Sequence, residues 1–260
     1  MPFRQVKSTR FYQFESMDHP DLVQAIFTRR GGVSPEPWHS LNVGGAIGDD
    51  LARVVENRRR AFEAVNRDPN SIYDVWQVHS SRVVVADEPR NGKDLIRADI
   101  LISDNPRVTL FMRFADCVPI LLYDPIRHAV GMAHAGWLGT VRGAAIKVVE
   151  AMADEFGTCA KDLLVGIGPS IGPDHYPVGP EVVMQVRQTL GENADKHLQE
   201  VHGEVLFNLW TANYEMLKKQ GVGRIEVAEL CTACHPEDWF SHRGEKGVTG
   251  RFGGLIALKE

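Results

Sequence analysis

The chain has 260 residues, of which 43% are hydrophobic and 24% charged, the proportions of an ordinary globular protein. Its formal net charge of −5 argues against the basic surface of a nucleic-acid platform. No apolar run approaches the ~20 residues of a membrane span, and residues 1–10 lack the apolar stretch of a signal peptide. We therefore expect a soluble, cytoplasmic protein that binds neither nucleic acid nor membrane. Its four cysteines should stay reduced, because disulfides are rare in that compartment.

The first half of the chain predicts closely spaced strands, interrupted by one long loop and one helix. Residues 29–50 are rich in Gly and Pro, and a loop of this length is more often functional than idle. Apolar residues recur at helical spacing from Leu51 to Val65, and Asp49 or Asp50 can cap that helix. The short connections between the strands favour antiparallel or mixed pairing. Strands are expected at residues 23–28, 72–79, 82–86, 99–103, 109–113, 120–123 and 129–133.

The second half alternates between helices and strands. Helical spacing is found over residues 141–156, 182–190 and 209–217, and strand patterns over residues 163–167, 225–228 and 255–258. Two such patterns in one chain predict a mixed α/β (α+β) fold, with a mixed β-sheet core and helices on its outer faces. There is no internal repeat, low-complexity tract or break in composition, so we expect one domain over residues 1–260.

Three predicted strands end close to a side chain that can bind a metal, namely His79, Cys117 and His134. These residues lie 38 and 17 positions apart, which is not the spacing of a zinc finger. Two imidazoles and one thiolate would give zinc three protein ligands and leave a fourth position for water or substrate, which is the catalytic arrangement. Zinc in such a site lowers the pKa of its bound water to about 7.

Short motifs of a known family occur in order along nearly the whole chain. They are Thr28-Arg29-Arg30-Gly31-Gly32-Val33-Ser34, Ser40-Leu41-Asn42-Val43-Gly44, Gly48-Asp49, Asn57-Arg58, Gln77-Val78-His79, Ala98-Asp99, Ala115-Asp116-Cys117-Val118-Pro119, His134-Ala135-Gly136-Trp137, Gly168-Pro169-Ser170-Ile171-Gly172, Cys231-Thr232, Ser241-His242-Arg243 and Thr249-Gly250-Arg251. On these residues the chain resembles the YfiH-type laccase-domain family, whose members are also called multicopper polyphenol oxidase-like proteins.

The resemblance implies a mixed α/β fold of layered sheets and helices, and a zinc ion held at His79, Cys117 and His134. It also implies phosphorolysis of adenosine, inosine and methylthioadenosine, together with deamination of adenosine. Other family members are described as copper-dependent phenol oxidases, or as hydrolases that edit wrongly built muropeptide precursors of peptidoglycan. His242 stands where an aromatic residue is commoner, which leaves the role of that position open.

Phosphorolysis requires an anion site, and arginine grips phosphate in a two-pronged fashion. Arg29, Arg58 and Arg243 are candidates, of which we favour Arg58 and Arg243 as phosphate binders. Asn42 and Gln77 could orient the nucleoside by reading a base edge or a ribose. The expected partners are thus a purine nucleoside and phosphate, and the protein should be a monomer or a small homo-oligomer.

Deamination would need a group that moves protons. Asp116 precedes Cys117, so on a continuous strand it would point to the opposite face, unless the strand ends there as Pro119 suggests. His175 is a second candidate, although a surface position in its loop is the simpler interpretation.

Two rival functions use the same three residues. The ten histidines contain no His-x-His motif, so a multicopper laccase mechanism is not expected, whereas a single Cu²⁺ at the Zn²⁺ site remains an alternative. A metal-free hydrolase would use Cys117 as the nucleophile with His79 or His134 as its base. A muropeptide-editing hydrolase fits either the thiol or the zinc chemistry.

The segment from Cys231 to His235 reads Cys-Thr-Ala-Cys-His, which matches a c-type haem attachment string. Haem attachment normally requires export, and no signal is visible. A second zinc site would need two more ligands, and Cys159 is the one remaining thiol. The role of this segment is left open.

A structural-metal protein that binds a partner is the non-enzymatic alternative. Three ligands argue against it, because structural zinc is usually fully enclosed by four. The residues suit a catalytic metal site, and the family resemblance implies a zinc-dependent purine nucleoside enzyme in which His79, Cys117 and His134 are both ligands and catalytic residues.

Overall fold

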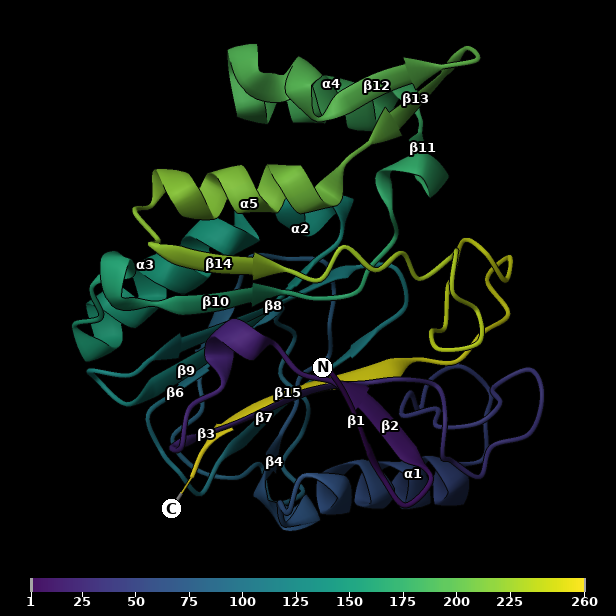
Figure 1. The fold of residues 1–260 in the computed structure, drawn as a ribbon, viewed down its shortest axis with the longest axis vertical. Coiled ribbons are helices and arrows are strands. Elements are labelled where there is room, and N and C mark those ends of the chain that lie inside the picture. Colours follow the sequence, from purple (N-terminus) through teal and green to yellow (C-terminus); the bar gives the residue numbers. More distant parts are fainter. Residues whose placement is uncertain (1, 260) are drawn as a thin grey trace.

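The chain folds into four layers, in which two β-sheets lie face to face between an outer helix on one side and a group of helices on the other (Figure 1). This arrangement confirms the predicted mixed α/β class and places the sheets inside the helices. The computed structural model describes residues 2–259. Met1 and Glu260, the end residues of the predicted domain, lie outside the described residues, and the single-domain boundary stays a prediction.

The first sheet has the strand order β1-β2-β3-β15-β7-β4. Its strands are β1 (Phe3–Val6), β2 (Thr9–Tyr12), β3 (Leu22–Phe27), β15 (Phe252–Leu258), β7 (Thr109–Phe114) and β4 (Ile72–Tyr73). The pairing of β4 with β7 is parallel and the others are antiparallel. Helix α1 (Leu51–Ala64) covers the outer face, and the Asp50 side chain caps it by accepting the Ala52 N–H.

The second sheet has the order β14-β10-β8-β9-β6-β5. Its strands are β14 (Arg224–Val227), β10 (Leu164–Ile167), β8 (Val118–Asp124), β9 (Ala129–Ala135), β6 (Ile100–Ser103) and β5 (Val83–Val85). On its outer side lie α2 (Trp137–Val141), α3 (Ala144–Phe156), α4 (Pro180–Leu190) and α5 (Leu209–Lys219). A small third sheet contains β11 (Pro177–Val178), β13 (Glu204–Phe207) and β12 (Leu198–Val201).

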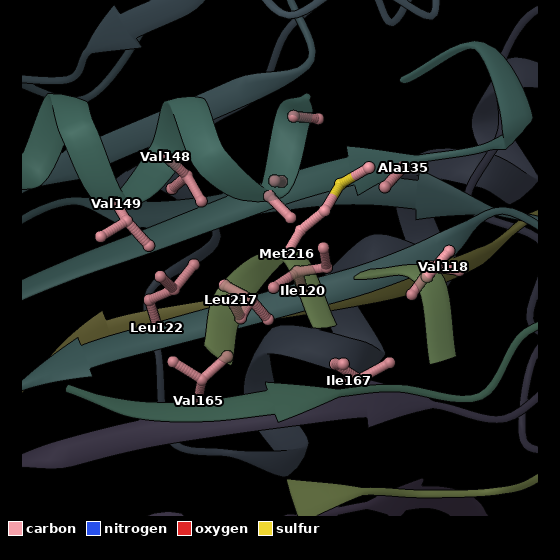
Figure 2. Close-up of a cluster of buried hydrophobic side chains, with 14 of the residues drawn as sticks. Val118, Ile120, Leu122, Ala135, Val148, Val149, Val165, Ile167, Met216 and Leu217 are labelled. Atoms are coloured by element: carbon pink, nitrogen blue, oxygen red, sulfur yellow. The ribbon is translucent and has the colours of Figure 1, made fainter. Parts of the chain in front are cut away.

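The side chains of strand β8 pack into two different hydrophobic cores. Because side chains alternate along a strand, Ile120 and Leu122 pack under the helices, whereas Leu121 and Tyr123 pack against the first sheet. This two-sided burial explains why β8 is apolar throughout. Figure 2 shows the helix side of this core, where the labelled residues are Val118, Ile120, Leu122, Ala135, Val148, Val149, Val165, Ile167, Met216 and Leu217.

Two predicted elements differ from the structure. The helix expected over residues 141–156 is split into α2 and α3 by Gly143, whose φ of 73° is left-handed. The strand expected over residues 72–79 stops after β4, because the N–H groups of residues 78–80 donate to the Asp99 side chain instead of a neighbouring strand.

Short elements without a strong pattern were not predicted. They are the β1–β2 hairpin, the third sheet and five 3₁₀ turns at Glu15–Met17, Pro69–Ser71, Ala160–Asp162, Pro173–His175 and Gly191–Lys196. Within residues 2–259, no helix is both long and apolar enough to cross a membrane.

Candidate metal centre and its cavity

The three predicted ligands meet at one point. His79 lies in the loop after β4, Cys117 in the turn between β7 and β8, and His134 on β9. The β8–β9 pairing places Val118 opposite Ala135 and Pro119 opposite His134, which brings Cys117 beside His134. One ligand atom from each of the three residues lies within 4.8 Å of the other two. This spacing fits a metal ion, whereas the role of the residues as ligands remains a prediction.

The buried carboxylate of Asp99 holds both histidines in place. His134 Nδ1 lies 2.9 Å from Asp99 Oδ1, which leaves Nε2 as the nitrogen available to a metal. The backbone N–H of His79 donates to the same oxygen at 3.0 Å. Burial raises the pKa of Asp99, but His134 and Ser80 outweigh that effect and lower it to about 2. Asp99 is therefore ionised at every physiological pH.

Cys117 and His134 each favour the charged form of the other, which lowers the pKa of the thiol and raises the pKa of the imidazole. Burial raises the pKa of Cys117, but the nearby His134 and His79 outweigh it and bring the pKa to about 6. Burial lowers the pKa of His134, but Cys117 and Asp99 raise it to about 9. Cys117 is therefore a thiolate at neutral pH, which is the form that binds metal or attacks an electrophile.

Gly136 leaves the space in which these groups converge. A Cβ at this position would lie 2.7 Å from Cys117 Sγ and 3.2 Å from His79 Nδ1. Its φ of −71° is open to any residue, so the requirement for glycine is one of volume and not of backbone conformation.

The candidate centre lies in the wall of a cavity of about 520 Å³, within the range of small-molecule sites. Three aromatic side chains line it, and Trp76 among them is 47% exposed. Three arginines also line it. The aromatic residues are Trp76, Trp137 and Tyr176, and the arginines are Arg113, Arg243 and Arg251.

Two of the four predicted substrate-binding residues line this cavity. Gln77 does so while its amide pairs with the Arg113 backbone, donating to the carbonyl at 2.8 Å and accepting the N–H at 3.0 Å. Arg243 lies with its guanidinium carbon 5.2 Å from the centre of the Tyr176 ring and donates to the Pro177 carbonyl.

The other two predicted substrate-binding residues, Arg58 and Asn42, lie behind the cavity wall. Arg58 donates to the Val43 carbonyl at 3.0 Å and lies 3.4 Å from the buried Asp74 carboxylate. Asn42 is fully buried, and its Oδ1 accepts the N–H groups of Gly44 and Arg251. Both therefore support the wall, and the structure does not bring either one to the cavity.

Two other residues considered from the sequence also lie outside the lining. Arg29 pairs with Glu245 at 3.0 Å. His175 lies in the turn Pro173–His175, and its neighbour Tyr176 lines the cavity in its place.

Asp116 does face the cavity, beside Cys117. Strand β7 ends at Phe114, and Asp116 has a left-handed φ of 83°, so the alternation of a continuous strand does not apply. Its carboxylate accepts the Thr232 hydroxyl at 2.7 Å and the Arg243 N–H at 2.7 Å.

Sequence reasoning missed Arg113 and Arg251. Burial lowers the pKa of Arg113 to about 10, and the neighbouring positive charge of Arg58 contributes to this shift. Burial also lowers the pKa of Arg251. Among the residues that the structure describes, no carboxylate forms an ion pair with Arg243 or Arg251, whereas Arg113 lies 3.7 Å from Asp74. Asp116 and Cys117 line the same cavity, but two guanidinium groups that are not held in an ion pair with a carboxylate suit an anionic ligand. The signal available for Arg251 was its motif Thr249-Gly250-Arg251.

Comparisons with known proteins show which family the chain resembles. The model of the family described as multi-copper polyphenol oxidoreductase laccase matches residues 23–259. Purine nucleoside phosphorylase YlmD of Bacillus subtilis (strain 168) is 33% identical over 255 residues, covering 94% of this chain and 91% of the relative.

Two solved structures are similar over nearly the whole chain. YlmD from Geobacillus stearothermophilus has a TM-score of 0.92 at 33% identity and covers 100% of this chain and 99% of its own. The Bacillus licheniformis hypothetical protein YfiH has a TM-score of 0.91 at 33% identity and covers 99% of both chains. These matches confirm the resemblance that the motifs indicated.

Proposed function

This chain belongs to the YfiH-type family described as multi-copper polyphenol oxidoreductase laccase, and from that premise we propose that it is a zinc-dependent purine nucleoside enzyme. Its substrates would be adenosine, inosine and methylthioadenosine, each cleaved by phosphate, and adenosine would also be deaminated. The observation that carries the proposal is the shared cavity, in which Arg243 and Arg251 face the same space as His79, Cys117 and His134. The name of the Bacillus subtilis relative agrees with this substrate class.

The cavity contains groups suited to each of the two substrates. The rings of Trp76, Trp137 and Tyr176 provide aromatic faces on which a purine can stack. The guanidinium groups of Arg243 and Arg251 would hold phosphate. In phosphorolysis a phosphate oxygen forms a bond to the anomeric carbon while the bond from that carbon to the purine nitrogen breaks, and the purine leaves with a proton. Fixing the phosphate beside the sugar makes this reaction effectively intramolecular.

The donor set of the centre fits zinc, because two imidazoles and a thiolate at mutual distances below 4.8 Å match its preferred ligands. Bound zinc would supply a Lewis acid and acidify a water molecule, which is the chemistry of adenosine deamination. The chain itself keeps His134 oriented through Asp99 and keeps Cys117 ionised. Copper is the alternative metal for the same donors, with phenol oxidation as its reaction.

One observation favours a second candidate, a cysteine hydrolase. Cys117, His134 and Asp99 form a thiolate, imidazolium and carboxylate series, which is the arrangement of an activated nucleophile. Such an enzyme could edit muropeptide precursors without any metal. The two candidates differ in their metal requirement and in their dependence on phosphate.

The phosphate subsite can be tested with matched arginine variants. We expect Arg251→Gln to raise the KM for phosphate in adenosine cleavage by at least about tenfold, because a charged hydrogen bond contributes about 1.5–3 kcal/mol. Arg58→Ala, which removes a cation behind the wall, should leave that KM unchanged. An unchanged KM in Arg251→Gln would contradict the assignment. Release of adenine by the wild-type enzyme at the same rate without phosphate would contradict phosphorolysis itself.

A further inference from the structure

A second group of potential ligands lies where two loops leave the second sheet. Strands β10 and β14 are parallel neighbours, so their carboxyl ends meet at the same edge (Figure 1). The loops that follow run together, since the Ser170 N–H donates to the Leu230 carbonyl and the Thr232 N–H donates to the Ser170 carbonyl. This pairing brings Asp174 and His175 from one loop beside Cys231 and Cys234 from the other.

The donor atoms of these four residues converge on one point. All of them lie within 4.8 Å of one another. His175 Nδ1 is 3.5 Å from Cys234 Sγ, 3.9 Å from Cys231 Sγ and 3.0 Å from Asp174 Oδ1. In a tetrahedral zinc site the standard bond lengths place sulfur about 3.6 Å from nitrogen, and nitrogen about 3.3 Å from oxygen. The observed separations therefore already approach those of a coordinated ion.

Hydrogen bonding within the group does not account for this convergence. A neutral imidazole Nδ1 either donates one hydrogen bond or accepts one, whereas three different donor atoms surround it here. A cation at the centre would satisfy all four groups together. We infer that Asp174, His175, Cys231 and Cys234 bind a second transition-metal ion, with zinc as the best match to two thiolates, an imidazole and a carboxylate.

Two features of Gly172 support the inference independently. Its N–H donates to Cys231 Sγ at 3.2 Å, the kind of backbone contact that orients a ligand around a metal. A Cβ at this position would lie 2.7 Å from Asp174 Oδ1 and 3.1 Å from Cys231 Sγ. Gly172 thus makes room for two of the donors, as Gly136 does at the first centre.

The second site lies outside the cavity but is connected to its wall. The residue after His175 is Tyr176, which lines the cavity, and the residue after Cys231 is Thr232, which donates to the cavity residue Asp116. A metal at the second site would therefore hold together the two loops that position Tyr176 and Thr232. His175 and Asp174 are 46% and 66% exposed, so the ion would be reachable from solvent.

The test uses Co²⁺, whose absorption reports thiolate ligands, on the full chain purified under reducing conditions. Wild-type protein should bind about two equivalents, and Cys117→Ser should retain about one that still shows thiolate-to-cobalt absorption. Adding Cys234→Ser or His175→Gln to Cys117→Ser should abolish that remaining absorption. Both side chains are exposed, so these changes should leave the fold intact, as circular dichroism can verify.

Cys159→Ser is the matched control, because this exposed cysteine lies outside both groups and should leave both equivalents bound. Absence of thiolate-to-cobalt absorption in the Cys117→Ser protein would overturn the inference. An unchanged spectrum after Cys234→Ser is added to Cys117→Ser would also overturn it. Because these measurements report bound metal and not turnover, they can fail without affecting the proposed nucleoside chemistry.

Discussion

Asp99→Asn should weaken the candidate metal centre without changing any of its three ligands. The Asp99 carboxylate has two roles, since Oδ1 contacts His134 Nδ1 and both oxygens accept backbone N–H groups of residues 78–80. Asparagine has nearly the same shape, but either orientation of its amide turns an NH₂ group toward a donor. The variant therefore changes charge and hydrogen bonding while preserving volume.

The expected magnitudes follow from those two roles. Loss of an outer partner of a ligating histidine typically costs 10–100-fold in metal affinity, or about 1.4–2.8 kcal/mol. The pKa of Asp99 lies near 2 instead of 3.8, which corresponds to about 2 kcal/mol of folding free energy. Because this pKa is depressed in the folded state, the stabilisation is present above pH 3.8 and is lost as pH falls through about 2.

Zinc affinity should be measured by competition with a chelator, and stability by urea unfolding of the metal-free protein. Asp49→Asn is the control, because Asp49 is a buried carboxylate that accepts from Ser34 and Asn42, away from the candidate ligands. Both variants should lose stability, but only Asp99→Asn should lose zinc affinity at the first centre. Equal zinc affinities in Asp99→Asn and wild type would refute the positioning role of Asp99.

Three further predictions concern the same region. Gly136→Ala should reduce zinc binding at least about tenfold while circular dichroism stays unchanged, because the new Cβ would lie 2.7 Å from Cys117 Sγ; full zinc occupancy would contradict this. In metal-free protein, alkylation of Cys117 should slow as pH falls through about 6, where the thiolate is protonated. A midpoint near the ordinary thiol value of about 8.5 would exclude the lowering of the thiol pKa by His134. Arg58→Ala should lower the free energy of unfolding by about 1–3 kcal/mol, because the buried Asp74 loses one of its partners, and urea titration that finds no loss would disprove this role.

Local patterns predicted those parts of the fold that local physics determines. Helical spacing with a cap at Asp50 predicted α1, and the apolar run around Ile120 predicted β8. The meeting of His79, Cys117 and His134 could also be expected, because all three follow or end predicted strands in one sheet-rich half.

Long-range contacts explain most of what was missed. Asp99 acts on His79 and Ser80 through backbone N–H groups some twenty residues away, and such contacts leave no pattern in the sequence. Arg58 was predicted to bind the anion and Arg251 was not considered, because the packing of α1 behind the cavity wall, which separates the two, is a long-range feature.

The second cluster escaped prediction for a related reason. Its four residues come from two loops that the parallel pairing of β10 and β14 brings together, and residues so far apart in the sequence leave no spacing motif. Cys159, the one remaining thiol, lies outside this cluster, and Asp174 and His175 lie within it.

The most direct test of the central claim combines metal analysis with product analysis. Protein purified without added metal would be analysed for zinc and copper, then incubated with adenosine with and without phosphate, and the products separated by chromatography. We predict bound zinc, adenine that appears only with phosphate, and inosine in both cases, with all products lost in Cys117→Ala. Zinc-loaded protein that forms neither adenine nor inosine would contradict the account.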